Sequence, residues 1–196
     1  MGNIWSVSSA LRYLGATCNV SDDPDQVLIA ESIVLPGVGS FRKAMEALKN
    51  SGLDQAITEA VNNRGVNILG ICLGMQLLGS EGTEDGDVEG LGLIQNRVDK
   101  FTESELGKNK VPHIGFNSVI LSEKEGFFRN LPDNPDFYFV HSYRLLPEDI
   151  SGRTAICSYG VDFLAAFESG NVYGTQFHPE KSQTNGLILL KNFLDQ

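Results

Sequence analysis

Apolar positions follow a helical spacing in some segments of the first half and form short continuous runs in others. Val7, Leu11 and Leu14 lie at positions i, i+4 and i+7, which predicts a helix that ends at Gly15. The run Ile33–Leu35, followed by Pro36–Gly39, predicts a buried strand that leads into a tight loop. The alternation continues with a helix over 41–48 capped by Ser40, a helix over 53–61 closed by Gly65, a strand over 66–71 and a helix over 73–78. This β-α-β-α order predicts a parallel sheet covered by helices on both faces.

The second half is richer in short strand-like segments. β-branched and aromatic residues predict strands over 111–121, 137–140, 154–158, 163–168 and 172–177, and the spacing of Leu187, Leu190 and Leu194 predicts a closing helix. We therefore expect a single α/β domain over 1–196. Its central sheet should be mostly parallel and flanked by helices, with additional antiparallel strands in the second half.

Composition narrows the classes of function. The chain has 196 residues with 15 Lys+Arg and 25 Asp+Glu, a formal net charge of −10. Such a charge argues against a nucleic-acid backbone or an anionic membrane as the main partner. There is neither an apolar run long enough to span a bilayer nor a secretory signal pattern. The three cysteines are widely spaced and form neither a disulfide framework nor a metal-binding pattern, which favours a reducing cytoplasm.

One acidic run, over 81–90, contains a faint resemblance to a calcium loop. The twelfth loop position would be Asn96, where a bidentate glutamate is needed. We therefore expect a solvated loop and no metal site.

The strongest chemical signal is Gly70-Ile71-Cys72-Leu73-Gly74, set between a predicted strand and a predicted helix. Flanking glycines permit a sharp turn that places the cysteine at the carboxyl end of the sheet. The helix N-terminus beside the sulfur would favour the reactive thiolate, and the backbone N–H of Leu73 could stabilise an oxyanion. The alternative is a small buried core cysteine.

A cysteine nucleophile needs a base, and the base needs an orienting group. His178 and Glu180 follow a predicted strand in Gln176-Phe177-His178-Pro179-Glu180, so both should lie at the carboxyl edge of the sheet. An ordinary strand-end histidine beside a surface glutamate remains the alternative. His113 and His141 have no carboxylate within five residues, so we interpret them as structural or lining residues.

These motifs, taken in order, resemble those of the class-I triad glutamine amidotransferases, and within them the glutaminase subunits of imidazole glycerol phosphate synthases. The matching blocks cover most of the chain: Leu35–Phe41, Gly70–Leu78, Pro112–Asn117, Tyr138–Tyr143, Gly174–Ser182 and Leu189–Phe193. The cysteine and His-Pro-Glu blocks mark the superfamily. The Pro112–Asn117 and Tyr138–Tyr143 blocks point to the subfamily.

The resemblance implies hydrolysis of L-glutamine to L-glutamate and ammonia, with Cys72 as nucleophile, His178 as general base and acid, and Glu180 as the orienting carboxylate. It implies an oxyanion hole at Leu73 and at Gly37 and Val38, and substrate binding by Gln76 and by the backbone at Ser142 and Tyr143. It implies no metal or organic cofactor. The ammonia would pass to a β/α-barrel cyclase subunit, in a heterodimer that makes imidazole glycerol phosphate for histidine biosynthesis.

Two departures from the family pattern concern the start of the chain and the docking surface. The family begins with an apolar strand ending in Asp-Tyr-Gly-x-Gly-Asn, whereas this sequence opens at Met1-Gly2-Asn3, so we expect that strand to be missing. Phe116 stands where the family usually has Trp. Asn3, Phe116 and Lys181 are the expected docking residues, and Gln76 also borders that side.

Three alternatives stay open from the sequence. A paralogous glutaminase could feed ammonia to surface-polysaccharide sugar amidation with the same triad. A non-catalytic regulatory subunit could keep the fold alone, although the intact Cys72, His178, Glu180 and Gln76 argue against it. A cysteine peptidase or thiol-handling protein is disfavoured by Gln76 and by the Tyr138–Tyr143 block.

Overall fold

The structure, a computed structural model, describes residues 2–147 and 150–196, with side chains from residue 4 onward. Its helices are α1 (Gly2–Tyr13), α2 (Pro24–Leu28), α3 (Phe41–Ser51), α4 (Leu53–Asn62), α5 (Leu73–Leu77), α6 (Glu103–Leu106) and α7 (Gln183–Leu194), with 3-10 turns η1 (Gly126–Phe128) and η2 (Pro179–Lys181). Its strands are β1 (Ser32–Gly37), β2 (Asn67–Cys72), β3 (Glu81–Gly82), β4 (Val88–Glu89), β5 (Arg97–Lys100), β6 (His113–Ser118), β7 (Ile120–Leu121), β8 (Asp136–His141), β9 (Tyr143–Leu145), β10 (Arg153–Tyr159), β11 (Val161–Ser169) and β12 (Val172–Thr175).

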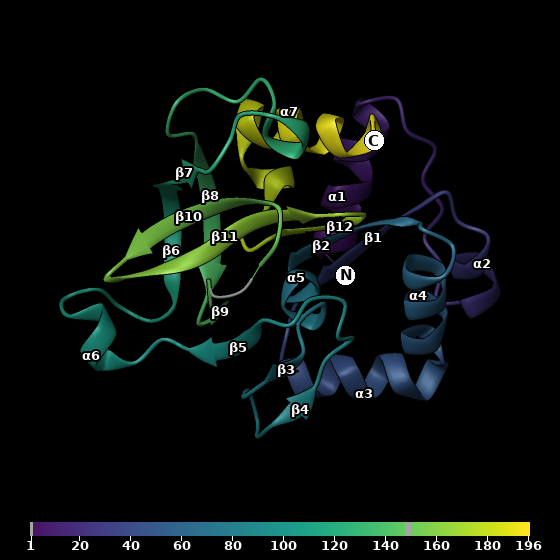
Figure 1. The fold of residues 1–196 in the computed structure, drawn as a ribbon, viewed down its shortest axis with the longest axis horizontal. Coiled ribbons are helices and arrows are strands. Elements are labelled where there is room, and N and C mark those ends of the chain that lie inside the picture. The colour runs from purple at the N-terminus through teal and green to yellow at the C-terminus, as the bar shows by residue number, and fades with distance from the viewer. Residues whose placement is uncertain (1, 148–149) are drawn as a thin grey trace.

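A mixed sheet forms the centre of the molecule (Figure 1). Its strand order is β1-β2-β12-β11-β10-β7, in which β1, β2 and β12 run parallel and the remaining pairings are antiparallel. Two smaller sheets, β4-β3-β5-β9 and β6-β8, lie beside it. The parallel part comes mainly from the β-α-β-α first half, and the antiparallel part comes from the strand-rich second half.

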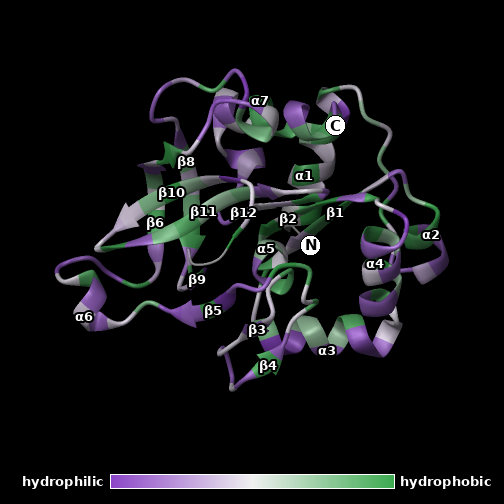
Figure 2. Cartoon of the chain, viewed as in Figure 1, coloured by the Kyte–Doolittle hydropathy of each residue, from purple (hydrophilic) through white to green (hydrophobic). Residues whose placement is uncertain are grey.

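Helices cover both faces of this sheet. Residues of β2 alternate between two apolar cores, because successive side chains of a strand point to opposite faces. Leu69 belongs to the core shared with α1 and α7, whereas Ile68 belongs to the core shared with α3 and α4. Figure 1 shows α1 and α7 together on one side and α3 and α4 on the other. In Figure 2, α3 and α4 carry both hydropathy colours, as expected of helices with one solvated face.

The helices and strands predicted in the first half are confirmed. Ser40 caps α3 by accepting a hydrogen bond from the backbone N–H of Lys43, and Gly52 ends that helix in a left-handed conformation. The closing helix is confirmed as α7.

The structure differs from the prediction over 111–121 and over 81–90. The single strand predicted over 111–121 is wrong, because β6 and β7 belong to different sheets and separate at Val119, whose side chain is buried. The segment 81–90, predicted as a solvated loop, contains a short hairpin, since β3 and β4 pair across a turn that contains Asp85 and Gly86, both with positive φ. Ion pairs from Arg97 to Glu81 and Asp87 support this hairpin.

At one side of the main sheet, β1 is the outer strand and pairs only with β2 among the described strands. A cavity of about 400 Å³ lies beside it, lined by Thr17, Asn19 and Ser21 and by residues of α2 and β1. Within the described part of the chain, no helix is long and apolar enough to cross a membrane.

Candidate active site

The cysteine lies at the junction of β2 and α5, at the carboxyl end of the parallel strands. Cys72 has φ 56° and ψ −111°, a backbone conformation that side-chain-bearing residues rarely adopt. The neighbouring glycine explains why this turn can form. A Cβ atom on Gly74 would collide with the carbonyl group of Leu35, so only glycine lets α5 pack this closely on β1. The Gly-x-Cys-x-Gly pattern is therefore a steric requirement of the turn.

The histidine and the glutamate form a buried ion pair just after β12. The Nδ1 atom of His178 lies 2.9 Å from Oε1 of Glu180, and the two side chains are 2% and 0% exposed. The backbone N–H of His178 donates to the carbonyl of Tyr138 at 2.9 Å, and the hydroxyl of Ser182 donates to the carbonyl of His178 at 2.7 Å. These two bonds hold the backbone of His178 beside β8, while its Nδ1 atom is hydrogen-bonded to Glu180.

The charge state of His178 follows from its partners. Burial lowers the pKa of the ring, but its interactions with Cys72 and Glu180 outweigh burial and raise the pKa to about 9. The imidazole therefore carries a proton at neutral pH. Glu180 satisfies the Nδ1 side of the ring, which leaves Nε2 for chemistry in the pocket.

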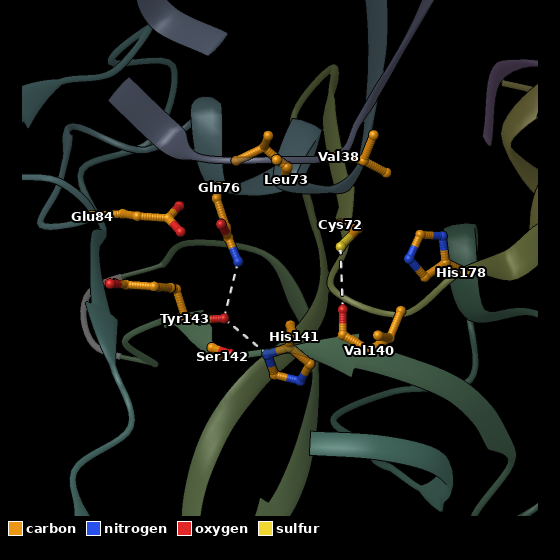
Figure 3. Close-up of a pocket in the computed structure, with 11 residues that line it drawn as sticks. Val38, Cys72, Leu73, Gln76, Glu84, Val140, His141, Ser142, Tyr143 and His178 are labelled. Carbon is orange, nitrogen blue, oxygen red and sulfur yellow. Dashed lines mark hydrogen bonds between the residues drawn. The ribbon is translucent and has the colours of Figure 1, made fainter. Parts of the chain in front are cut away.

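A cavity of about 300 Å³ opens beside the cysteine. Figure 3 shows Glu84 and Gln76 at one side of it and Cys72 and His178 at the other. Its wall comes from loops and element ends that are far apart in sequence: Val38, Gly39, Cys72, Leu73, Gln76, Glu84, Val140, His141, Ser142, Tyr143 and His178. The thiol of Cys72 donates toward the carbonyl of Val140 at 3.9 Å.

The Gln76 side chain is held by two hydrogen bonds. Its amide nitrogen donates to the backbone carbonyl of Tyr143 and to Oε1 of Gln176, both at 2.9 Å. Both amide hydrogens are thereby used, so the group that Gln76 still offers is its carbonyl oxygen, an acceptor.

A buried cysteine, histidine and carboxylate at one pocket fit several hydrolase families, and comparison with known proteins decides between them. The family model for glutamine amidotransferase class-I matches residues 1–196. The chain belongs to the class-I glutamine amidotransferase family. The resemblance seen in the sequence is confirmed.

Similar members of this family are HisH proteins. The chain is 46% identical over 193 residues to the imidazole glycerol phosphate synthase subunit HisH of Moorella thermoacetica, covering 98% of this chain and 90% of that one. It is 42% identical over 196 residues to HisH of Acinetobacter baylyi, covering 100% of this chain and 94% of that one.

Solved structures support the amidotransferase fold. A putative GMP synthase protein from Thermoplasma acidophilum superposes with a TM-score of 0.71 at 22% identity, covering 97% of this chain and 85% of that one. Another glutamine amidotransferase gives a TM-score of 0.71 at 16% identity, covering 97% and 91%. The predicted fold class is confirmed by these likenesses.

This amidotransferase brings most of the predicted site residues together. Cys72 and His178 line one pocket with Glu180 directly behind the histidine, and the same pocket wall holds the predicted oxyanion and substrate residues Val38, Leu73, Gln76, Ser142 and Tyr143. Gly37 stands apart: it pairs with Cys72 in the ladder between β1 and β2 and does not line the pocket.

Two of the expected docking residues lie close together. Phe116 is on β6, and Lys181 is in the 3-10 turn η2. Phe116, 48% exposed, packs edge-on against Tyr138 with ring centroids 5.6 Å apart, and the ammonium of Lys181 lies 5.9 Å from the same ring. The three side chains therefore form one surface cluster. The side chain of Asn3 lies outside the described residues.

Sequence reasoning missed three residues of the site. Glu84 lines the pocket and accepts a hydrogen bond from the backbone N–H of Phe41 at 2.8 Å, because the β3-β4 hairpin carries it there. Val140 offers its carbonyl to the thiol, and Gln176, the residue after β12, reaches the sulfur. The sequence held a signal for two of them, because Val140 lies in the Tyr138–Tyr143 block and Gln176 lies two residues before His178 in the Gly174–Ser182 block. His141 lines the pocket, which is one of the two roles expected of it.

Proposed function

We propose that this chain is the glutaminase subunit of an imidazole glycerol phosphate synthase, which hydrolyses L-glutamine to L-glutamate and ammonia and delivers the ammonia to a cyclase subunit. The buried cluster of Cys72, His178 and Glu180 at one pocket carries the proposal. Full-length relatives that are HisH subunits support the pathway. All three cysteines are free, which supports a reducing cytoplasm as the site of action.

In the first step, the sulfur of Cys72, as the thiolate beside the protonated His178, attacks the carbon of the substrate side-chain amide. A C–S bond forms, and the amide oxygen takes negative charge, which the backbone N–H groups of Leu73 and Val38 would stabilise. The C–N bond then breaks as the protonated ring of His178 gives its proton to the nitrogen. Ammonia leaves, and a thioester remains on the cysteine.

In the second step, water attacks the thioester carbon while His178 accepts the proton of the water. The C–S bond breaks, glutamate leaves, and the thiolate of Cys72 and the imidazolium of His178 are restored. Glu180 holds the imidazole in the tautomer that both steps need, and it stabilises the imidazolium that each cycle forms.

The far end of the pocket suits the amino-acid end of glutamine. The carboxylate of Glu84 and the remaining acceptor of Gln76 lie away from Cys72 (Figure 3), and both attract an ammonium group. A substrate bound there by its α-amino group would direct its side chain toward the sulfur.

The outer face of the paired strands β6 and β8 is the proposed docking surface for the cyclase, a β/α-barrel subunit. Ile114 pairs with Val140, and Phe116 pairs with Tyr138, so these four side chains share one face. Ile114 and Phe116 are 60% and 48% exposed, whereas Val140 lines the pocket. An apolar face that borders the pocket fits a partner that must receive ammonia from it.

Two alternatives are disfavoured. The HisH relatives favour the histidine pathway over the polysaccharide pathway. The assembled triad favours an enzyme over a regulatory subunit that keeps only the fold.

The test is glutamate release from glutamine by the purified chain, alone and with a histidine-pathway cyclase that carries its own nucleotide ligand. Strong stimulation by the cyclase is expected. Glutamate release that the cyclase leaves unchanged would contradict the proposed partner, and a folded protein that releases none under either condition would contradict the glutaminase.

A further inference from the structure

The backbone carbonyl of Tyr143 is the fixed point of a buried hydrogen-bond chain. It accepts from the amide nitrogen of Gln76 at 2.9 Å and from Nδ1 of His141 at 2.8 Å. Figure 3 shows this oxygen between the two side chains. A carbonyl oxygen can only accept, so both neighbours must donate to it.

One series of hydrogen bonds leads from this carbonyl to the sulfur of Cys72. Gln76 donates to Tyr143, so the atom of Gln176 that lies 2.9 Å from the Gln76 nitrogen must be an acceptor, Oε1. The amide nitrogen of Gln176 is therefore the atom 3.7 Å from the sulfur of Cys72. Both glutamines are buried. The orientation of Gln176 is fixed by its surroundings, and it presents a donor to the sulfur.

The second hydrogen bond to this carbonyl fixes the tautomer of His141. Burial lowers the pKa of His141 to about 3, so the ring is neutral, and its proton is on Nδ1, which donates to Tyr143. The Nε2 atom then accepts from Nδ1 of His113, which lies 3.1 Å away. His113 is itself stacked between Phe139 and Tyr159. The aromatic core thus supports the carbonyl that orients the glutamines.

We propose that Gln176 is a further residue of the catalytic centre, whose amide donates a hydrogen bond to the sulfur of Cys72 and stabilises it when it carries negative charge. Gln76 and the Tyr143 carbonyl act through Gln176 as positioning groups. The inference rests on the proposed role of Cys72 as nucleophile. The thioester step needs the sulfur as an anion, and a hydrogen bond to a charged group is about twice as strong as one to a neutral group.

The experiment measures the rate of alkylation of Cys72 by iodoacetamide against pH, in a Cys18→Ser background without partner or glutamine. Cys157 does not interfere, because burial raises the pKa of its thiol to about 12. Gln176→Glu keeps the oxygen that accepts from Gln76 and replaces the donor to the sulfur by a second carboxylate oxygen, which also brings a negative charge there. We expect the half-maximal pH of alkylation to rise by about one unit or more, since one charge-assisted hydrogen bond is lost and a negative charge is added, and the rate at pH 7 to fall about tenfold or more.

Two further variants separate this role from a structural one. Gln176→Met keeps the volume without a charge and should shift the profile in the same direction. Asn192→Leu removes a different buried amide, which donates to the carbonyls of Phe127 and Arg129, and should leave the profile unchanged.

An unchanged profile in a folded Gln176 variant would overturn the inference. A profile shifted equally by Asn192→Leu would overturn it as well, since a general loosening of the fold would then explain both. Alkylation requires neither glutamine nor a partner, so this test is independent of the glutaminase assay. If the glutaminase proposal failed and this inference held, the Gln176 variants would shift the alkylation profile of a chain that releases no glutamate.

Discussion

His178 and Glu180 are joined by a single hydrogen bond inside the protein, between Nδ1 and Oε1, while the second carboxylate oxygen of Glu180 has no hydrogen-bond partner among the described residues. The carboxylate is therefore directed wholly at the imidazole. In the proposed mechanism Glu180 orients the ring and stabilises the imidazolium, whereas the ring itself moves the proton.

Glu180→Gln should therefore reduce turnover less than His178→Ala does. The glutamine retains the shape of the side chain, and its oxygen can accept a hydrogen bond from Nδ1 of His178, but it carries no charge. Steady-state kcat for glutamate release in the presence of the partner compares the two variants. Equal losses would contradict the separate roles assigned to the two residues.

Cys72→Ala should abolish glutamine hydrolysis and leave the ammonia-dependent reaction of the cyclase intact. The alanine removes the nucleophile and little volume, so the docking surface should keep its form. Assays of the complex with glutamine and with ammonium salts distinguish the two activities. Loss of both would indicate that Cys72 is structural.

The buried His141 should make the fold sensitive to acid. In the unfolded chain the ring takes a proton near pH 6.5, whereas burial keeps the pKa in the folded chain at about 3. Below pH 6.5 the unfolded state binds more protons, so the free energy of unfolding falls as the pH falls, by up to about 1.4 kcal/mol per pH unit for one such group.

His141→Gln preserves a donor for the Tyr143 carbonyl and removes the titration. Urea unfolding of both proteins between pH 6.5 and 5 should therefore show a shallower decline for the variant. The raised pKa of His178 acts in both proteins and cancels in the difference. Parallel declines would contradict the assignment to His141.

Phe116→Asp and Ile114→Asp should weaken association with the cyclase. Charging the centre of an apolar contact costs about 2 kcal/mol or more, some thirtyfold in Kd. Both residues are exposed, so the melting temperature of the isolated chain should change little. Ile120→Asp, at an isoleucine 68% exposed on β7, is the matched control. Titration calorimetry would contradict the docking surface if all three variants bound equally well.

An apolar strand added before Met1 should raise the melting temperature by several degrees. Such a strand could pair with the outer edge of β1 and fill the cavity lined by Thr17 and the β1 residues. A glycine- and serine-rich extension of equal length is the control. Calorimetric scans that agree for both extensions would mean that the sheet gains nothing there.

The sequence predicts the parts of this structure that local patterning controls. The spacing of Val7, Leu11 and Leu14 suffices for α1, and the two flanking glycines suffice for the turn at Cys72. Contacts between residues that are far apart in the sequence cannot be predicted from such local patterns. Nothing local to the acidic run shows that Glu84 will accept from the N–H of Phe41, a contact across 43 positions. Nor does any periodicity separate β6 from β7, because their partners lie in different sheets.

The backbone of Cys72 has a cost to the fold as well as a use in the site. At φ 56° and ψ −111°, an L-residue is held in a sparsely populated conformation at a cost of the order of 1–3 kcal/mol. Selection for stability alone would thus disfavour any side chain at this position, the proposed nucleophile included. The thiol at this position lowers the stability of the fold, whereas the proposed activity requires it, so stability and activity oppose each other at this one residue.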